Sequence, residues 1–203
     1  MRPLALVRPL VWCLFIVALP ALGQRPSRSG VGFKIGPQWA TQHAAEFNYE
    51  PVPGAVAGLY VPLWCGHRLE LQPELLLSWQ GSAHTLHEGS TQVLSMFYVQ
   101  LPFSAKIFVS NVLNLQCGVQ AGKLLLAQVG KTDVSDQYRP FDLGFNLGVG
   151  VDLIRGVDLT LRYYSGMSTV LEDTSGNIFP TNRTYQLTMG YRFKQFTHRR
   201  ARR

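Results

Sequence analysis

Apolar and polar residues alternate one by one along much of this chain, and only a β-strand sorts such a pattern onto two opposite faces. The alternation is clearest over residues 141–153, where Phe, Leu and Val at odd positions are separated by Asp, Gly and Asn at even positions. Residues 113–122 show the same pattern. A helix would distribute these apolar residues around its whole circumference, so we expect an all-β fold.

The alternation predicts eight strands, and in each of them the odd-numbered residues form the more apolar face. The expected strands span residues 30–39, 54–64, 67–79, 93–109, 112–124, 141–154, 156–166 and 184–194. Four prolines count against this assignment, because proline removes a donor from the ladder and belongs at edges or bulges. They are Pro37, Pro62, Pro73 and Pro102.

The connections between these strands alternate in length. Tight reversals are expected at residues 65–66, 110–111 and 155–156, and long polar loops at 40–53, 80–92, 125–140 and 167–183. Short turns on one side and long loops on the other are typical of outer-membrane barrels, whose short turns lie in the periplasm. We therefore expect an eight-stranded antiparallel up-and-down transmembrane β-barrel with both termini on the periplasmic side.

The contents of the two faces distinguish this barrel from a soluble lipocalin-like barrel, which also alternates. The odd face carries almost no charge beyond strand ends, whereas the even face mixes glycines with charges of both signs. These charged residues are Lys34, Glu70, Glu74, Lys106, Asp142, Asp152, Asp158, Arg162 and Arg192. Glycines on an inward face leave room for charged side chains in the narrow lumen of eight strands. An apolar exterior around a polar interior suits a bilayer.

Aromatic residues support the membrane interpretation. Six of them occupy odd positions next to the predicted long loops, namely Trp39, Trp79, Phe97, Phe141, Tyr163 and Tyr185. Aromatic rings favour the headgroup zone, so these residues predict a girdle at the outer interface. Phe33 and Phe193 are expected to mark the inner interface.

The first residues have the pattern of an export signal. Arg2 and Arg8 supply positive charge, residues 9–20 are almost wholly apolar, and residues 21–23 have the small side chains that signal peptidase reads. The apolar run is shorter than the roughly 20 residues of a membrane-spanning helix. We expect a signal peptide over residues 1–23, the barrel over 24–194 and a basic periplasmic tail over 195–203.

The net charge of +7 is concentrated at the two ends of the chain. Since the body is close to balanced and the basic tail is short and poor in aromatics, we expect no nucleic-acid binding. The tail is expected to be solvated or to touch anionic lipid. Cys65 and Cys117 fall in a predicted turn and in a predicted strand, so we expect two free thiols.

The strongest candidate for chemistry is a polar group in the predicted loop 80–92. It consists of Ser82, His84, His87 and Glu88. Serine, histidine and acid sets occur at the outer rim of some barrel hydrolases and proteases. The two histidines, however, are three residues apart in a loop, and no third metal ligand accompanies them. We therefore expect a solvated polar loop, with no catalytic, cofactor-binding or metal-ligating residue.

Charges on the predicted inner face allow two interpretations. Five residues suggest a transport pathway, namely Glu70, Glu74, Lys106, Asp142 and Arg162. A structural plug of salt bridges has the same composition, because buried charges must be paired. We favour the plug.

Several segments resemble the outer-membrane β-barrel domain of Bacteroidetes, the group of small porin-like proteins that includes the PorT family. The segments are residues 72–81, 98–103, 141–150, 161–166 and 182–193, and they cover the barrel from the third strand onward. The resemblance implies an outer-membrane location and assembly by the barrel-insertion machinery, but no particular activity. Phe193 is similar to the aromatic residue that often ends the last strand of such proteins, although ten residues follow it here.

These observations predict a small non-enzymatic protein of the cell outer membrane, structural or partner-binding through its long external loops, and an accessory in protein secretion. Its expected partners are outer-membrane lipid, the barrel-assembly machinery and a protein at the external loops. Two alternatives remain open. One is a narrow pore for small solutes, and the other is a rim enzyme acting on lipid or peptide.

Overall fold

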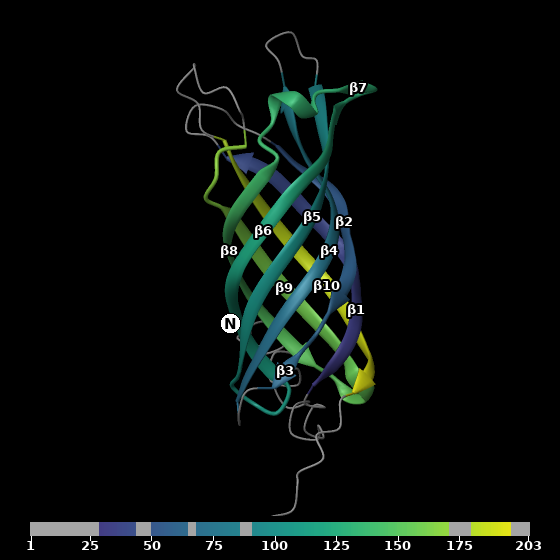
Figure 1. The fold of residues 1–203 in the computed structure, drawn as a ribbon, viewed down its shortest axis with the longest axis vertical. Coiled ribbons are helices and arrows are strands. Elements are labelled where there is room, and N and C mark those ends of the chain that lie inside the picture. The colour runs from purple at the N-terminus through teal and green to yellow at the C-terminus, as the bar shows by residue number, and fades with distance from the viewer. Residues whose placement is uncertain (1–28, 44–49, 65–67, 86–90, 171–179, 196–203) are drawn as a thin grey trace, which may run out of the picture.

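Eight long antiparallel strands form a closed ring in the computed structural model, which describes residues 29–43, 50–64, 68–85, 91–170 and 180–195 (Figure 1). The long strands are β1 (Gly30–His43), β2 (Glu50–Tyr60), β4 (Leu69–Thr85), β5 (Thr91–Phe108), β6 (Leu113–Val129), β8 (Phe141–Asp152), β9 (Val157–Gly166) and β10 (Thr181–Gln195). Two short strands, β3 (Leu63–Trp64) and β7 (Thr132–Asp133), pair with β4 and β6. Within the described residues, no helix is long and apolar enough to cross a membrane. The predicted eight-stranded barrel is confirmed.

Each long strand pairs with the next long strand in the chain, and the ring closes between β1 and β10. At this closure Trp39 lies opposite Tyr185. Closing the ring gives every long strand two partners, so the backbone donors and acceptors are paired within the sheet. The order of the strands is that of the predicted meander.

Burial follows the same period of two as the sequence. Along β8, for example, Phe141, Leu143 and Phe145 are exposed, whereas Asp142 and Asn146 are buried. The exposed face of the barrel is apolar and the buried face is largely polar. This inverts the arrangement of a soluble protein and suits a barrel whose outer wall contacts lipid.

The tight connections lie together at one end of the barrel, which we call the short-turn end. Between β8 and β9 lies the 3₁₀ turn η3 (Ile154–Gly156), in which Arg155 and Gly156 have φ angles of 64° and 82°. Between β5 and β6, the N–H of Leu113 donates to Ser110 Oγ at 3.0 Å. The reversals predicted at 110–111 and 155–156 are confirmed, and the one at 65–66 lies outside the described residues.

At the opposite, long-loop end the strands are longer than the sequence pattern predicts. The strands β4, β5 and β6 contain 17, 18 and 17 residues, whereas about 9–11 tilted residues cross a bilayer. Residues 80–85 and 91–92, predicted as loop, continue the ladder between β4 and β5 as far as the pair Thr85 and Thr91. Parts of the predicted loops 40–53 and 125–140 also belong to strands, since β1 extends to His43, β2 begins at Glu50 and β6 extends to Val129. Figure 1 shows the ends of β4, β5 and β6 projecting on the side of the barrel where β7 lies.

The predicted aromatic girdle is exposed on the outer wall, but part of it lies away from the strand ends. Trp79 and Phe97 stack with ring centroids 6.1 Å apart, and both lie well inside β4 and β5. The rings of Tyr163 on β9 and Tyr185 on β10 pack against each other, with their centroids 4.9 Å apart. The position predicted for Trp79 and Phe97 at strand ends is therefore wrong, because the sheet continues beyond them.

Three of the four prolines lie within strands, and Pro62 lies between β2 and β3. The register of β1 with β10 passes from Ile35 to Gln38, so Pro37 lies where this ladder is interrupted. The register of β4 with β5 passes from the pair Pro73 and Phe103 to the pair Leu76 and Gln100, so Pro102 lies within an interruption and Pro73 borders it. A missing donor is tolerated at such an interruption because no ladder bond is required there.

The apolar wall predicts how the barrel responds to charge. Leu147 is exposed in the middle of β8, so the change Leu147→Arg should cost about 2–4 kcal/mol of folding free energy in lipid. In gel mobility with and without boiling, the wild type should migrate faster unboiled, and the variant should show less of this folded band.

The change Gln137→Arg is the matched control, since Gln137 is exposed beyond the barrel wall. It should leave the folded band unchanged. A Leu147→Arg variant that folds as well as the wild type would contradict a lipid-facing wall at this position.

Candidate functional site

The lumen is the most distinctive part of the barrel, and one carboxylate in its middle binds side chains from other strands. Glu74 on β4 accepts two hydrogen bonds from the guanidinium of Arg162 on β9, at 2.9 and 2.7 Å. Lys34 Nζ on β1 donates to the same carboxylate at 2.8 Å, and Gln72 Nε2 donates at 2.5 Å. The strands β4 and β9 stand on opposite sides of the ring. Glu74 therefore ties three separate strands together across the lumen.

A second charged network lies nearer the short-turn end. Lys106 and Arg192 each approach both Glu70 and Asp152, with nitrogen to oxygen distances from 3.6 to 3.9 Å. All four side chains are at most 4% exposed. Alternating charges of this kind compensate one another where water is excluded. Together the two networks fill this half of the lumen with paired charge.

Uncharged amides and hydroxyls occupy the next part of the lumen. Gln38 Nε2 lies 2.7 Å from Ser78 Oγ and 2.6 Å from the carbonyl oxygen of Trp79, and it donates to both. Gln186 Nε2 donates to Gln38 Oε1 at 3.1 Å. These bonds link β1, β4 and β10 above the charged networks.

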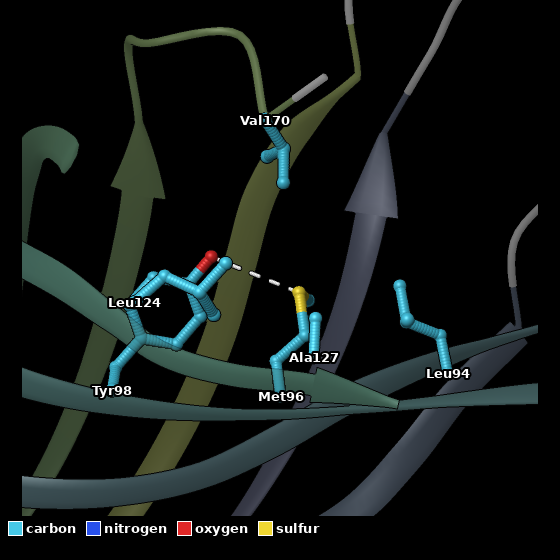
Figure 2. Close-up of a cluster of buried hydrophobic side chains, with 6 residues drawn as sticks. All are labelled: Leu94, Met96, Tyr98, Leu124, Ala127 and Val170. Carbon is cyan, nitrogen blue, oxygen red and sulfur yellow. Dashed lines mark hydrogen bonds between the residues drawn. The ribbon is translucent and has the colours of Figure 1, made fainter. Parts of the chain in front are cut away.

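Toward the long-loop end the β5 and β6 side of the lumen becomes apolar, which the sequence pattern did not predict. Six buried residues form what we call the outer cluster, shown in Figure 2. They are Leu94, Met96, Tyr98, Leu124, Ala127 and Val170. The Tyr98 hydroxyl points toward Met96 Sδ at 3.7 Å. The outer cluster lines the β5 and β6 side of the barrel mouth with apolar side chains.

A folded-back segment covers the outer cluster. Val134 and Tyr138 pack against it. The N–H of Val134 donates to the carbonyl of Ala127 at 2.9 Å, and the N–H of Ala127 donates to Ser135 Oγ at 2.9 Å. A register shift between β5 and β6, beside Phe97 and Tyr98, changes the phase of β6 so that Ala127 is buried. Residues 132–140 are thereby fixed over the mouth.

The sequence matches the family model of the outer membrane protein beta-barrel domain over residues 23–172. This covers most of the chain and agrees with the closed ring and its apolar wall. The chain belongs to this family. Its location is the outer membrane. The family relationship does not extend to an assignment within Bacteroidetes or to the PorT group.

Solved outer-membrane barrels share the fold at low sequence identity. Neisserial surface protein A is 12% identical, with a TM-score of 0.53, and the match covers 81% of this chain and 98% of that protein. Ail, the attachment invasion locus protein of Yersinia pestis, is 12% identical, with a TM-score of 0.50 and coverage of 82% and 99%. No curated protein sequence matches the chain.

Of the residues suggested for rim chemistry, the two that the structure describes, Ser82 and His84, lie on β4 and not in a loop. Ser82 lies on β4 and is 3% exposed, and the backbone of His84 continues the same strand opposite Gln92. His87 and Glu88 lie outside the described residues. Among the residues that the structure describes, no three His, Cys, Asp or Glu residues gather where they could hold a metal ion. The expectation of a loop at Ser82 is wrong because the ladder continues past it.

The remaining predictions concern the cysteines and the inner charges of the barrel. Cys117 is a free thiol exposed on the wall, as expected, and Cys65 lies outside the described residues. Four of the five inner charges suggested for a pathway are engaged in ion pairs. Asp142 is the exception, since no ion pair within 4 Å among the described residues includes it.

The geometry around Glu74 predicts a large stability effect. The change Glu74→Gln leaves Lys34 and Arg162 buried beside a neutral amide, which should lower the free energy of unfolding by about 3–5 kcal/mol. Urea unfolding in lipid vesicles, followed by gel mobility, measures the loss.

Glu50→Gln provides the matched control, because Glu50 is exposed at the first residue of β2. This change should have little effect. Equal stability of the two variants would show that the contacts of Glu74 do not stabilise the barrel.

Proposed function

We propose that this protein is a non-conducting, non-enzymatic barrel that binds a protein partner through its outer end. The binding surface consists of residues 80–85 of β4, 91–95 of β5 and 126–140, and we call it the protruding surface. One observation carries the proposal. The barrel extends well past the length required to cross a bilayer while its lumen is filled, so the extra structure serves the outside of the barrel.

The filled lumen favours this proposal over a pore. A solute crossing the barrel would have to displace the ion pairs of Glu74 and then pass the outer cluster. Separating buried paired charges is costly. The barrel interior therefore acts as a rigid support for its outer end.

The protruding surface is ordered by its own hydrogen bonds, which favours specific binding because less freedom is lost on association. The 3₁₀ turn η2 (Ser135–Gln137) is held by a bond from the N–H of Gln137 to the carbonyl of Val134 at 3.0 Å. Ser135 donates through its N–H and its hydroxyl to the carboxylate of Asp133, which lowers the pKa of Asp133. Exposed side chains of both charges surround the turn, namely Lys131, Asp133, Asp136 and Arg139.

The fold is used for attachment elsewhere, which is consistent with a surface-binding role. One solved barrel of this shape is named attachment invasion locus protein, and a second structure of it holds the heparin analogue sucrose octasulfate. The alternative of a rim enzyme has less support. Ser82 is buried on β4 and not presented in an exposed loop, and no three His, Cys, Asp or Glu residues of the described part of the chain gather where they could hold a metal ion.

Further parts of the proposal rest on the sequence. Residues 1–23 act as an export signal, residues 195–203 form a basic periplasmic tail, and the barrel-assembly machinery inserts the protein. The segments that resemble the PorT family, such as residues 141–150, favour an origin in Bacteroidetes and a partner in protein secretion.

Site-specific photocrosslinking in intact cells tests the binding surface. A photoreactive residue in place of Gln137 should form an adduct of discrete mass with a second protein, because Gln137 is exposed on the protruding surface. The same probe in place of Leu147 on the lipid-facing wall is the control and should form none. Reversing two exposed charges, Lys131→Glu with Arg139→Glu, should abolish the adduct. Absence of an adduct at Gln137 in the wild-type background would contradict the proposal.

Single-channel recording in planar bilayers tests the closed lumen. The wild-type barrel should produce no discrete current steps, because both networks and the outer cluster block the path. A porin reconstituted in the same bilayers shows that channels are detectable. Stable steps from the wild type that scale with salt concentration would favour the pore instead.

A further inference from the structure

One buried carboxylate in the lumen lies apart from the charged networks. Asp142 on β8 is 6% exposed. Its Oδ2 accepts a hydrogen bond from Asn182 Nδ2 at 2.8 Å, and the Tyr164 hydroxyl and the backbone N–H of Leu143 also donate to the carboxylate. Its Oδ1 has no hydrogen-bond partner. Asp142 is therefore a buried acidic group held in place by neutral residues.

The other buried carboxylates of the lumen have positive charges near them. Glu70, Glu74 and Asp152 are in ion pairs. Asp158 accepts a hydrogen bond from the Tyr60 hydroxyl at 2.5 Å and interacts electrostatically with Lys34, Lys106 and Arg162. An isolated buried charge is strongly disfavoured unless a partner compensates it. For Asp142, the described residues supply no positively charged partner within 4 Å.

Two amide oxygens at inward positions of β5 and β6 also lack donors. Gln100 Oε1 and Gln120 Oε1 have no hydrogen-bond partner, and each residue is 2% exposed. In the ladder Gln100 lies opposite Gly122, and Gly122 lies opposite Asp142. Gln120 lies opposite Gly144, which follows Asp142 on the same face of β8. Three unpartnered oxygens thus occupy adjoining inward positions on β5, β6 and β8.

Glycines keep other side chains away from this place. A Cβ atom on Gly166 would lie 3.1 Å from Asp142 Oδ1. A Cβ atom on Gly144 would lie 2.7 Å from the ring of Tyr164, and one on Gly122 would lie 3.5 Å from the ring of Tyr98. The absence of side chains on three neighbouring strands leaves the carboxylate bordered by two tyrosine rings and by acceptor oxygens.

We propose that Asp142, Gln100 and Gln120 bind a monovalent metal cation in the outer half of the lumen. The site offers three oxygen acceptors without donors, and a positive ion satisfies them together. Oxygen ligands select hard cations over transition metals. A single carboxylate matches one positive charge, whereas calcium sites combine several carboxylates. The outer cluster, which includes Tyr98, separates the bound ion from the outside.

Thermal unfolding of the full-length barrel tests the site. Choline chloride is replaced by NaCl or KCl at constant ionic strength, and the folded band is followed by gel mobility. A ligand that binds only the folded state should raise the midpoint by roughly 3–5 °C at a concentration tenfold above Kd, and the rise should continue only logarithmically. Asp142→Asn should abolish this rise. The matched control Asp136→Asn should keep it, since Asp136 is exposed on η2.

A direct measurement on the wild type keeps the test independent of the variants. The ²³Na resonance should broaden in the presence of the folded barrel, and excess KCl should reverse the broadening by displacing the bound sodium. Equal midpoints in choline, sodium and potassium together with an unchanged resonance would overturn the proposal. A rise that persists in Asp142→Asn, or one produced only by magnesium or calcium, would overturn it as well.

Discussion

Hydrogen bonding of the backbone inside lipid is the constraint on which the rest of this structure depends. Lipid offers no partner to an open N–H or C=O group, so a chain that crosses with strands must close them into a ring. The closure between β1 and β10 meets this requirement. Once the ring is closed, every residue in the wall points either to lipid or to the lumen. The alternation of apolar and polar residues follows from that geometry.

The lumen then poses a second problem, because eight strands enclose only enough space for side chains. Polar residues that avoid lipid are forced together there, and charges must find partners. Arg162 and Lys34 do so by sharing Glu74, which connects walls that the sheet itself links only around the circumference. The interior bonds therefore add stiffness across the barrel where the backbone ladder supplies it only around the ring.

The two ends of the barrel differ in what fills them. At the short-turn end the chain reverses within a few residues, and charged side chains occupy the space between the strands. At the long-loop end the strands continue, the β5 and β6 side of the lumen becomes apolar, and residues 132–140 fold back over the outer cluster. This asymmetry makes the outer end both a closed mouth and an ordered surface. This asymmetry is the basis on which we propose binding, and not passage, for this barrel.

The sequence predicts the strand positions correctly where lipid imposes a contrast between the two faces, and incorrectly where no such contrast exists. Within the bilayer, apolar residues such as Leu147 mark the wall, and the strands were predicted close to their observed positions. Beyond the bilayer both faces of a strand tolerate polar residues, so residues 80–85 resembled a loop although the ladder continues through them. The outer cluster had a visible signal, since residues 93–99 are apolar at nearly every position. Its meaning depended on which other segments met it.

The sequence by itself determined the number of long strands, the two faces of the wall within the bilayer and the inverted wall, because all of these follow from a period of two read against lipid. The partners of the inner charges depended on the tertiary structure, since Glu74 lies 88 positions from Arg162 and only the closed ring brings them together. The same is true of the isolation of Asp142 and the cover over the outer cluster. Contacts across a lumen join residues on strands far apart in the sequence, and no local sequence pattern predicts which of these residues contact each other.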